Sequence, residues 1–311
     1  MLAPKLLARN RLAPATPRGG RFRFTYFRRL ALTGVLLILP AVGHLAFFGI
    51  YPVLRSIYLS FHSWGLSGAP QFVGFGNYLQ LFKDPDFGHS VGVTLIYSLG
   101  LSAALSVVSL IVALLFDRRF PLRDLFRAIY FVPVIVPWVV TAIVWNLIYN
   151  PSYGLYHVIT DPIGFSQILW IQNIRLVLVA LILMGIWKGF GYYMVIYLAG
   201  LQGIATEFYE AAQVDGANRM DTFRHITLPL LRPTILLVMI STMVDSFQVF
   251  TPVWLLTRGG PAAASRMLTI YTYENAFVFL KMGYATAIAT IMLITLVVVT
   301  RVQMHLWRPL T

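Results

Sequence analysis

Six long runs of apolar residues limit what this chain can fold into. An α-helix needs about 20 apolar residues to cross the hydrocarbon core of a bilayer, and each run is of about that length. We therefore predict an all-α integral membrane protein with six transmembrane helices. The runs lie at about 31–52, 91–116, 128–149, 175–200, 233–256 and 283–307. The third and fifth contain Pro133, Pro137 and Pro252, which spans tolerate where neighbouring helices or water satisfy the freed backbone groups.

The composition supports lipid as the surrounding solvent. Hydrophobic residues make up 58% of the 311 residues and charged residues 11%, against roughly a quarter in an ordinary soluble domain. Because there is no cysteine, disulfides and thiolate metal sites are excluded. The net charge of +13 would suggest nucleic acid as the partner of a soluble protein. Here we assign it to membrane topology and predict no nucleic-acid partner.

Lysine and arginine are distributed unequally over the predicted loops, and the loops with the excess are cytoplasmic. One set of loops and ends contains Lys5, Arg9, Arg11, Arg18, Arg21, Arg23, Arg28, Arg29, Arg118, Arg119, Arg123, Arg127, Arg219, Arg224, Arg232, Arg301 and Arg308. The opposite set contains Arg55, Lys83, Arg175, Arg258, Arg266 and Lys281. We therefore predict that both termini lie in the cytoplasm.

Residues 1–30 form a basic arm before the first span. They contain no acidic residue, and the apolar run that follows is longer than the core of a signal peptide, about 7–15 residues. We predict that this run is retained as a span and that the arm lies on anionic membrane lipid. The predicted organisation is an arm, 1–30, and a six-helix transmembrane domain, 31–311.

The loop at 201–232 is long for a connection between two spans. Thr206 is a suitable N-cap for a helix that ends at Gly216 in a left-handed conformation. Asn218 can cap a second helix, and Pro229 is predicted to stop it. On physical grounds this protrusion is either a docking element or an amphipathic loop resting on the membrane surface.

The spacing of this loop resembles a known motif. The pattern Glu210-Ala211-Ala212-x3-Gly216-x9-Ile226-x-Leu228-Pro229 is similar to the EAA loop of bacterial ATP-binding-cassette (ABC) importer permeases. The resemblance implies the type I importer permease fold and a place in the bacterial cytoplasmic (inner) membrane. It also implies that the loop contains a coupling helix, which docks to a separate ATPase. The docking residues it implies are Glu210, Ala211, Ala212, Asp215 and Gly216.

Other segments resemble the carbohydrate-uptake branch of these permeases, including the larger membrane subunit of the maltose importer and the glycerol 3-phosphate permeases. They are the signature Leu256–Pro261, the segments 271–277 and 283–287, and the short motif 72–78. One position departs from the pattern, because Thr251 follows Phe250 where many relatives have Asp. The resemblance implies import of an oligosaccharide or related polyol by alternating access.

Two charged residues lie in mid-membrane, where charge is costly and points to function. Lys188 lies near the middle of the fourth span and Asp245 near the middle of the fifth. Two interpretations remain open: the two side chains neutralise each other, or at least one contacts the solute. The other solute candidates are Tyr192, Thr242, Ser246 and Gln248 on the same spans, with Trp145 and Asn146 on the third, where helix packing is the alternative.

The sequence contains no motif for chemistry by the chain itself. It lacks a Gly-x4-Gly-Lys-Ser/Thr phosphate-binding loop and shows no histidine cluster that would hold a metal. We predict no catalytic residue, metal or cofactor here, and the resemblance implies that two separate ATPase subunits bind ATP and magnesium. It further implies a second permease of similar fold and an extracytoplasmic solute-binding protein as partners. The alternative is an ion-coupled transporter or channel acting alone, with Lys188 and Asp245 on the ion path.

Overall fold

A computed structural model describes residues 20–117, 121–155 and 168–307, with side chains from residue 31 onward. The chain forms two compact units, Met1–Arg55 and Ser56–Thr311. Its helices are α1 (Gly20–His44), η1 (Leu45–Ile50), α2 (Tyr51–Ser60), α3 (Gly76–Lys83), α4 (Pro85–Asp117), α5 (Arg123–Ile135), α6 (Trp138–Ile148), α8 (Val177–Gln202), α9 (Thr206–Val214), α10 (Arg219–Thr222), η3 (Phe223–Thr227), α11 (Leu228–Leu230), α12 (Arg232–Phe247), α13 (Thr251–Leu256), α14 (Leu268–Tyr273), η4 (Glu274–Val278) and α15 (Met282–Leu306). Two short antiparallel strands, β1 (His62–Ser63) and β2 (Gln71–Phe72), pair His62 with Phe72.

The predicted spans correspond to long apolar helices. Within the described residues, five helices are long and apolar enough to cross a membrane, and there are six if the bent pair α5 and α6 is counted as one span. The five cover Ala31–Ser60, Pro85–Asp117, Val177–Gln202, Arg232–Leu256 and Met282–Leu306. The first therefore continues eight residues beyond its predicted end, and the second begins six residues before its predicted start.

The third span differs from the single helix predicted at 128–149. It consists of α5 and α6, which meet at an angle of 98°. Val136 between them is extended, with φ −65° and ψ 129°, and Pro137 precedes the first residue of α6. Proline has no N–H to continue a helix, and its ring disfavours the helical conformation of the residue before it. The break therefore lies where the sequence Val136-Pro137 requires it.

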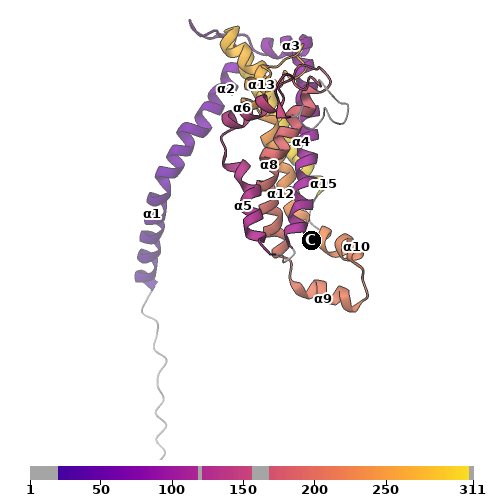
Figure 1. The fold of residues 1–311 in the computed structure, drawn as a ribbon. Helices are drawn as coiled ribbons and strands as arrows, with labels where there is room; N and C mark the ends of the chain where they lie inside the picture. Colours follow the sequence, from indigo (N-terminus) through magenta and orange to yellow (C-terminus); the bar gives the residue numbers. More distant parts are fainter. Residues whose placement is uncertain (1–19, 118–120, 156–167, 308–311) are drawn as a thin grey trace, which may run out of the picture. The chain divides into compact units, whose positions relative to one another are not determined.

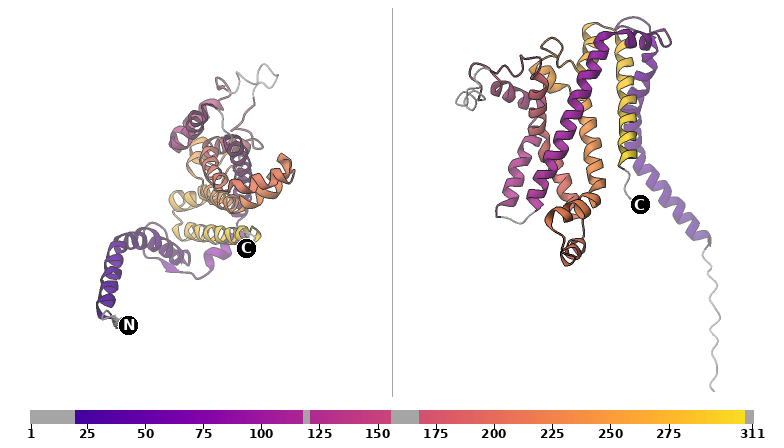
Figure 2. Two further views of the ribbon diagram at one scale, coloured as in Figure 1. Left: turned by 90° about the horizontal axis from the view of Figure 1, so that it is seen from below. Right: turned by 90° about the vertical axis from the view of Figure 1, so that its right-hand side faces the viewer.

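The core lies where α4 crosses α8 and α12. Helix α4 packs along α8 over much of its length and also along α12, and Figure 2 shows these long helices side by side. Their shared interior is filled by Tyr97, Leu101, Met184, Tyr197 and Val238, all buried. One polar pair inside this core is formed by Ser102, whose hydroxyl lies 2.6 Å from that of Thr242.

The fifth span is also in two pieces. Helix α12 ends at Phe247, and α13 begins at Thr251 with Pro252 in its first turn, where a missing N–H costs little. Helix α13 packs against α6, the second piece of the third span. The two broken spans thus meet through their second pieces.

Gly191 allows α8 to lie directly against α5. A Cβ atom at this position would lie 2.2 Å from the carbonyl oxygen of Tyr130.

We expect Gly191→Ala to push the two helices apart and to lower the free energy of unfolding by about 1–3 kcal/mol, as overpacking does. Gly92 in α4 is the matched control, because nothing lies within 4 Å of its Cβ position; Gly92→Ala should be neutral or stabilising by up to about 1 kcal/mol. Thermal unfolding in detergent micelles measures both, and equal shifts would contradict the contact.

Candidate functional site

The loop between α8 and α12 contains a short exposed helix, α9, followed by α10. Figure 1 shows the two helices protruding from the end of the helical bundle. Helix α9 begins at Thr206, one residue earlier than a cap at Thr206 requires. Ala205 is the extended N-cap residue, without a side-chain hydrogen bond, and Thr206 is already helical. Thr206 is therefore not the N-cap, and Glu207 lies in the first turn of the helix.

The end of α9 is fixed by Gly216, as predicted. Its φ is +76°, in the left-handed region that favours glycine. The N–H of Gly216 donates to the carbonyl of Gln213 at 3.1 Å, and the N–H of Ala217 donates to the carbonyl of Ala212 at 2.9 Å. These two bonds form a Schellman motif, which satisfies carbonyls at the helix end. The chain direction after α9 therefore depends on a left-handed residue at 216.

The second helix of the loop starts as predicted but does not end where predicted. The side chain of Asn218 accepts bonds from the backbone N–H groups of Met220 and Asp221, so it caps α10. The chain then stays helical through η3 and α11 to Leu230, one residue beyond Pro229, and a turn at Leu231 precedes α12. Pro229 lies in the first turn of α11, directly after the wide π-helical turn η3, where a missing N–H is tolerated.

The predicted docking residues differ in their exposure. Glu210, Ala211, Asp215 and Gly216 are exposed, whereas Ala212 is buried against the chain. Two apolar residues of α9 are also exposed, Val214 at 88% and Phe208 at 52%. The exposed surface of α9 thus combines the carboxylate of Glu210 with the apolar side chains of Val214 and Phe208.

A hollow of about 440 Å³ with a mixed polar and apolar lining lies between this loop and the bundle. The residues around it are Leu114, Asp117, Leu201, Tyr209, Gln213, Ala217, Arg219, Thr222, Phe223 and Thr227. Across the loop itself, the hydroxyls of Tyr209 and Thr227 lie 3.3 Å apart.

Lys188 and Asp245 do not pair with each other in the described structure. The Lys188 ammonium is buried, with 7% exposure, and donates to the carbonyl oxygens of Pro133 at 2.7 Å and Val134 at 2.9 Å. Asp245 is exposed and accepts a 2.6 Å bond from the hydroxyl of Tyr193. The interpretation that the two charges neutralise each other is wrong, because each is bonded to a different partner.

The remaining solute candidates separate by exposure. Tyr192, Gln248 and Asn146 are exposed, as Asp245 is. Thr242 and Ser246 are buried and bond to Ser102 and to backbone carbonyls of their own helix. Trp145 is half-buried and packs against Tyr149 and Trp187. The packing alternative therefore describes the environment of Trp145 but not that of the exposed Asn146.

Tyr193 is a site residue that the sequence analysis missed. Its hydroxyl bonds to Asp245, and its ring centroid lies 5.2 Å from that of Tyr192. It therefore brings two predicted candidates, Tyr192 and Asp245, to one place between α8 and α12. The available signal was the mid-membrane acid itself, because a carboxylate within the spans needs a hydrogen-bond donor. A tyrosine on a neighbouring span, such as Tyr193, can supply one.

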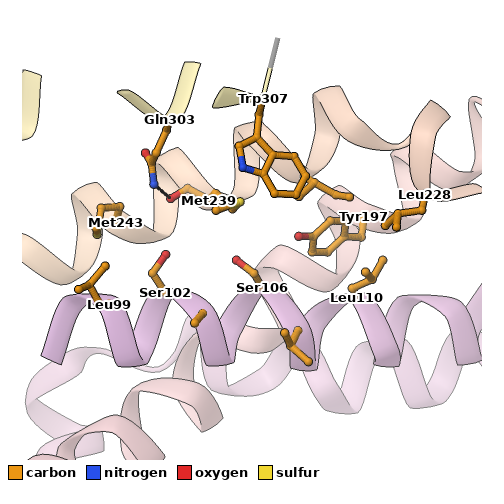
Figure 3. A pocket seen from close by; sticks show the side chains of 13 residues that line it. Leu99, Ser102, Ser106, Leu110, Tyr197, Leu228, Met239, Met243, Gln303 and Trp307 are labelled. Carbon is orange, nitrogen blue, oxygen red and sulfur yellow. Dashed lines mark hydrogen bonds between the residues drawn. The ribbon is translucent and has the colours of Figure 1, made fainter. Parts of the chain in front are cut away.

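A cavity of about 360 Å³ lies elsewhere, between α4, α8, α12 and α15. Figure 3 shows its lining, in which the few polar groups are Ser102, Ser106, Tyr197 and Gln303 among aliphatic and sulfur-containing side chains. None of the predicted solute residues is among the described residues that line it. A sugar needs many hydrogen-bond partners, so this cavity is a poor solute site.

The signature Leu256–Pro261 lies in a hydrogen-bonded turn that follows α13, at the end of the bundle opposite α9 and α10 (Figure 1). The Ser265 hydroxyl lies 2.7 Å from that of Thr257 and donates to the Gly260 carbonyl at 2.6 Å. Arg266 forms ion pairs with Glu274 at 2.7 Å and Asp86 at 3.2 Å. The turn is therefore braced on both sides, and it anchors α13 and α14.

A neighbouring carboxylate joins three elements at this end. Asp84 accepts hydrogen bonds from the hydroxyls of Tyr271 and Tyr284. Burial alone would raise the pKa of Asp84, but these bonds stabilise its charged form and lower the pKa below its usual value. Asp84 thus ties the start of α4 to α14 and α15 as a carboxylate.

Comparison with known families matches residues 93–309 to the binding-protein-dependent transport system inner membrane component. The sulfoquinovosyl glycerol transport system permease protein SmoG of Agrobacterium fabrum is 33% identical over 89% of this chain and 91% of its own length. The trehalose/maltose transport system permease protein MalF of Thermococcus litoralis is 32% identical over 86% and 91%. A solved bacterial alginate ABC transporter in complex with its periplasmic protein has a chain with a TM-score of 0.79 and 23% identity, covering 92% and 96%.

The chain belongs to the family of binding-protein-dependent transport system inner membrane components. It is a membrane-spanning permease subunit of an ABC transporter, and the predicted type I permease fold is confirmed by its structural relatives. Family membership thus favours an importer subunit over the alternative of an ion-coupled transporter or channel acting alone.

Proposed function

We propose that the chain imports a sugar as one of two paired permeases, driven by two separate ATPase subunits that bind ATP and magnesium. A solute-binding protein delivers the sugar from outside. The observation that supports this proposal best is the exposed helix α9, which ends at a left-handed Gly216 and presents Glu210, Ala211 and Asp215 outward. Closure of the ATPases moves α9, and the spans joined to it then change which side of the membrane has access to the solute.

The surface of α9 has the chemistry of a docking element. Val214 and Phe208 are apolar and exposed at the tip of a loop, where a partner can cover them and release water. Glu210 lies on the same short helix and offers a carboxylate to the rim of the contact. Small Ala211 permits close approach of a partner backbone, while Ala212 packs inward and supports the helix from behind.

The orientation we propose puts both termini and the loop 201–232 in the cytoplasm of a bacterium. The excess of arginine in the loops on that side supports it. The basic residues of the arm, 1–30, are proposed to lie on anionic lipid, before the six-helix domain at 31–311. Residues 1–19 of this arm lie outside the described residues.

Carbohydrate is the solute class that we propose. Relatives are named for sulfoquinovosyl glycerol, for trehalose and maltose, and for lactose. In this chain Asp245, Gln248 and Tyr192 offer a carboxylate, an amide and an aromatic ring on exposed surface within the spans. Those groups suit sugars, which combine hydroxyls with apolar ring faces.

Reconstitution tests the proposal. The tagged chain is purified in mild detergent with the subunits that accompany it, reconstituted in proteoliposomes, and assayed with radiolabelled trehalose, maltose and lactose. We expect uptake that requires enclosed ATP and a solute-binding protein, and no uptake when the purified chain is reconstituted alone. Uptake by the chain alone under a proton or sodium gradient would instead establish the ion-coupled alternative.

A further inference from the structure

Lys188 has an unusual set of partners for a buried cation. Its ammonium lies among the spans with 7% exposure, where a charge is costly unless it is paired. Both of its hydrogen bonds in the described structure go to backbone carbonyls, those of Pro133 and Val134. The Trp138 ring lies 5.5 Å away and adds a favourable cation–π contact. These partners all lie on either side of the break between α5 and α6.

The break explains why these two carbonyls need a donor. In a continuous helix the carbonyl of residue i accepts from the N–H of residue i+4. The Pro133 carbonyl would therefore accept from residue 137, but Pro137 has no N–H. The Val134 carbonyl would accept from Trp138, but the chain bends by 98° before that residue. The ammonium of Lys188 thus stands where two helical N–H groups are missing.

We propose that Lys188 is a positioning residue that holds the broken third span in place. Its ammonium replaces the two N–H donors lost at the break, one absent from Pro137 and one turned away by the bend, and it fastens the end of α5 to α8. With the end of α5 fastened, α6 leaves at the observed angle and reaches α13. Lys188 accordingly contacts neither the solute nor Asp245, and its charge is satisfied by the backbone dipoles at the break.

Three variants and a matched proline control test this role. Lys188→Met removes the donors and leaves two buried carbonyls without partners, whereas Lys188→Arg retains donors. Pro137→Ala restores the N–H that the Pro133 carbonyl lacks. Pro252→Ala is the control, because this proline lies at the other span break, at the start of α13, away from the carbonyls that Lys188 binds.

The first readout is thermal unfolding of the purified complex in detergent. We expect Lys188→Met to lower Tm by about 5–10 °C, as the loss of two buried hydrogen bonds in a chain of this size implies. In the Pro137→Ala background, Lys188→Met should lower Tm by less than half of that amount. In the Pro252→Ala background, Lys188→Met should lower Tm by the full amount. Equal losses in all three backgrounds would overturn the proposal.

The second readout follows the direction of α6. The chain has no native cysteine, so spin labels at Val144→Cys on α6 and Leu255→Cys on α13, both exposed positions, report their separation. We expect Lys188→Met to broaden or shift the distance distribution and Lys188→Arg to preserve it. If Lys188→Met does not accumulate, rescue of its accumulation by Pro137→Ala but not by Pro252→Ala supports the same role. An unchanged distribution and Tm with a raised KM for uptake would mean that Lys188 contacts the solute.

Discussion

Replacing Gly216 with valine is expected to reduce ATP-dependent uptake at least tenfold without preventing membrane insertion. Residue 216 has φ +76°, which costs an ordinary residue about 1–2 kcal/mol and a β-branched residue more. That cost corresponds to a factor of about 5–30 in the population of the ordered end of α9. Nothing lies within 4 Å of the Cβ position, so the effect is one of backbone conformation rather than of a steric clash.

The control for Gly216→Val is Gly216→Asn, because asparagine adopts the left-handed conformation more readily than other side chains. We expect the asparagine variant to retain most uptake. Both variants are measured in proteoliposomes for uptake and in detergent for the amount of ATPase that co-purifies, with insertion followed by expression in the membrane fraction. Normal uptake by Gly216→Val would contradict coupling through α9.

Replacing Asp245 with alanine is expected to raise the KM for sugar uptake about 10- to 100-fold. Asp245 is an exposed carboxylate in the middle of a span, and a hydrogen bond from a sugar hydroxyl to a charged group contributes about 1.5–3 kcal/mol. Asp245→Asn keeps an acceptor for the Tyr193 hydroxyl while removing the charge, so we expect an intermediate effect. The measurement is the dependence of uptake rate on sugar concentration.

The adjacent Ser246 provides the control for Asp245. It is buried, and its hydroxyl bonds to the Met243 carbonyl of its own helix. Ser246→Ala should therefore leave KM within about twofold, since the helix already satisfies that carbonyl through its backbone. If Asp245→Asn lowers Tm but leaves KM unchanged, Asp245 supports Tyr193 rather than contacting the solute.

The positions of the spans were predictable because lipid imposes a length and a composition on every crossing helix. The cap at Asn218 and the left-handed Gly216 were predictable because both depend on local backbone chemistry. The break at Pro137 was not, although the proline was noted, because Pro133 in the same run stays inside α5. Which proline bends a span depends on the tertiary partners of the freed carbonyls, and here that partner is Lys188, 55 residues further along the chain than Pro133.

The exposure of the polar residues within the spans was also hard to predict, because it too depends on tertiary packing. Thr242 and Ser246 are buried and Asp245 between them is exposed, a division that depends on which face of α12 packs against α4 and α8. The sequence pattern of an apolar span does not show which face packs against protein, because apolar side chains are accepted equally by lipid and by neighbouring helices. Tyr193 became visible as a site residue through its bond to another span.

The two helices that border the loop 201–232 are hydrogen-bonded to each other. Helix α8 leads into the loop and α12 leads out of it, and Tyr193 of α8 bonds to Asp245 of α12. One turn earlier on α12, Thr242 bonds to Ser102 of α4. In the mechanism we propose, a displacement of α9 is therefore transmitted to α8, α12 and α4 together, because these hydrogen bonds join the three helices inside the membrane.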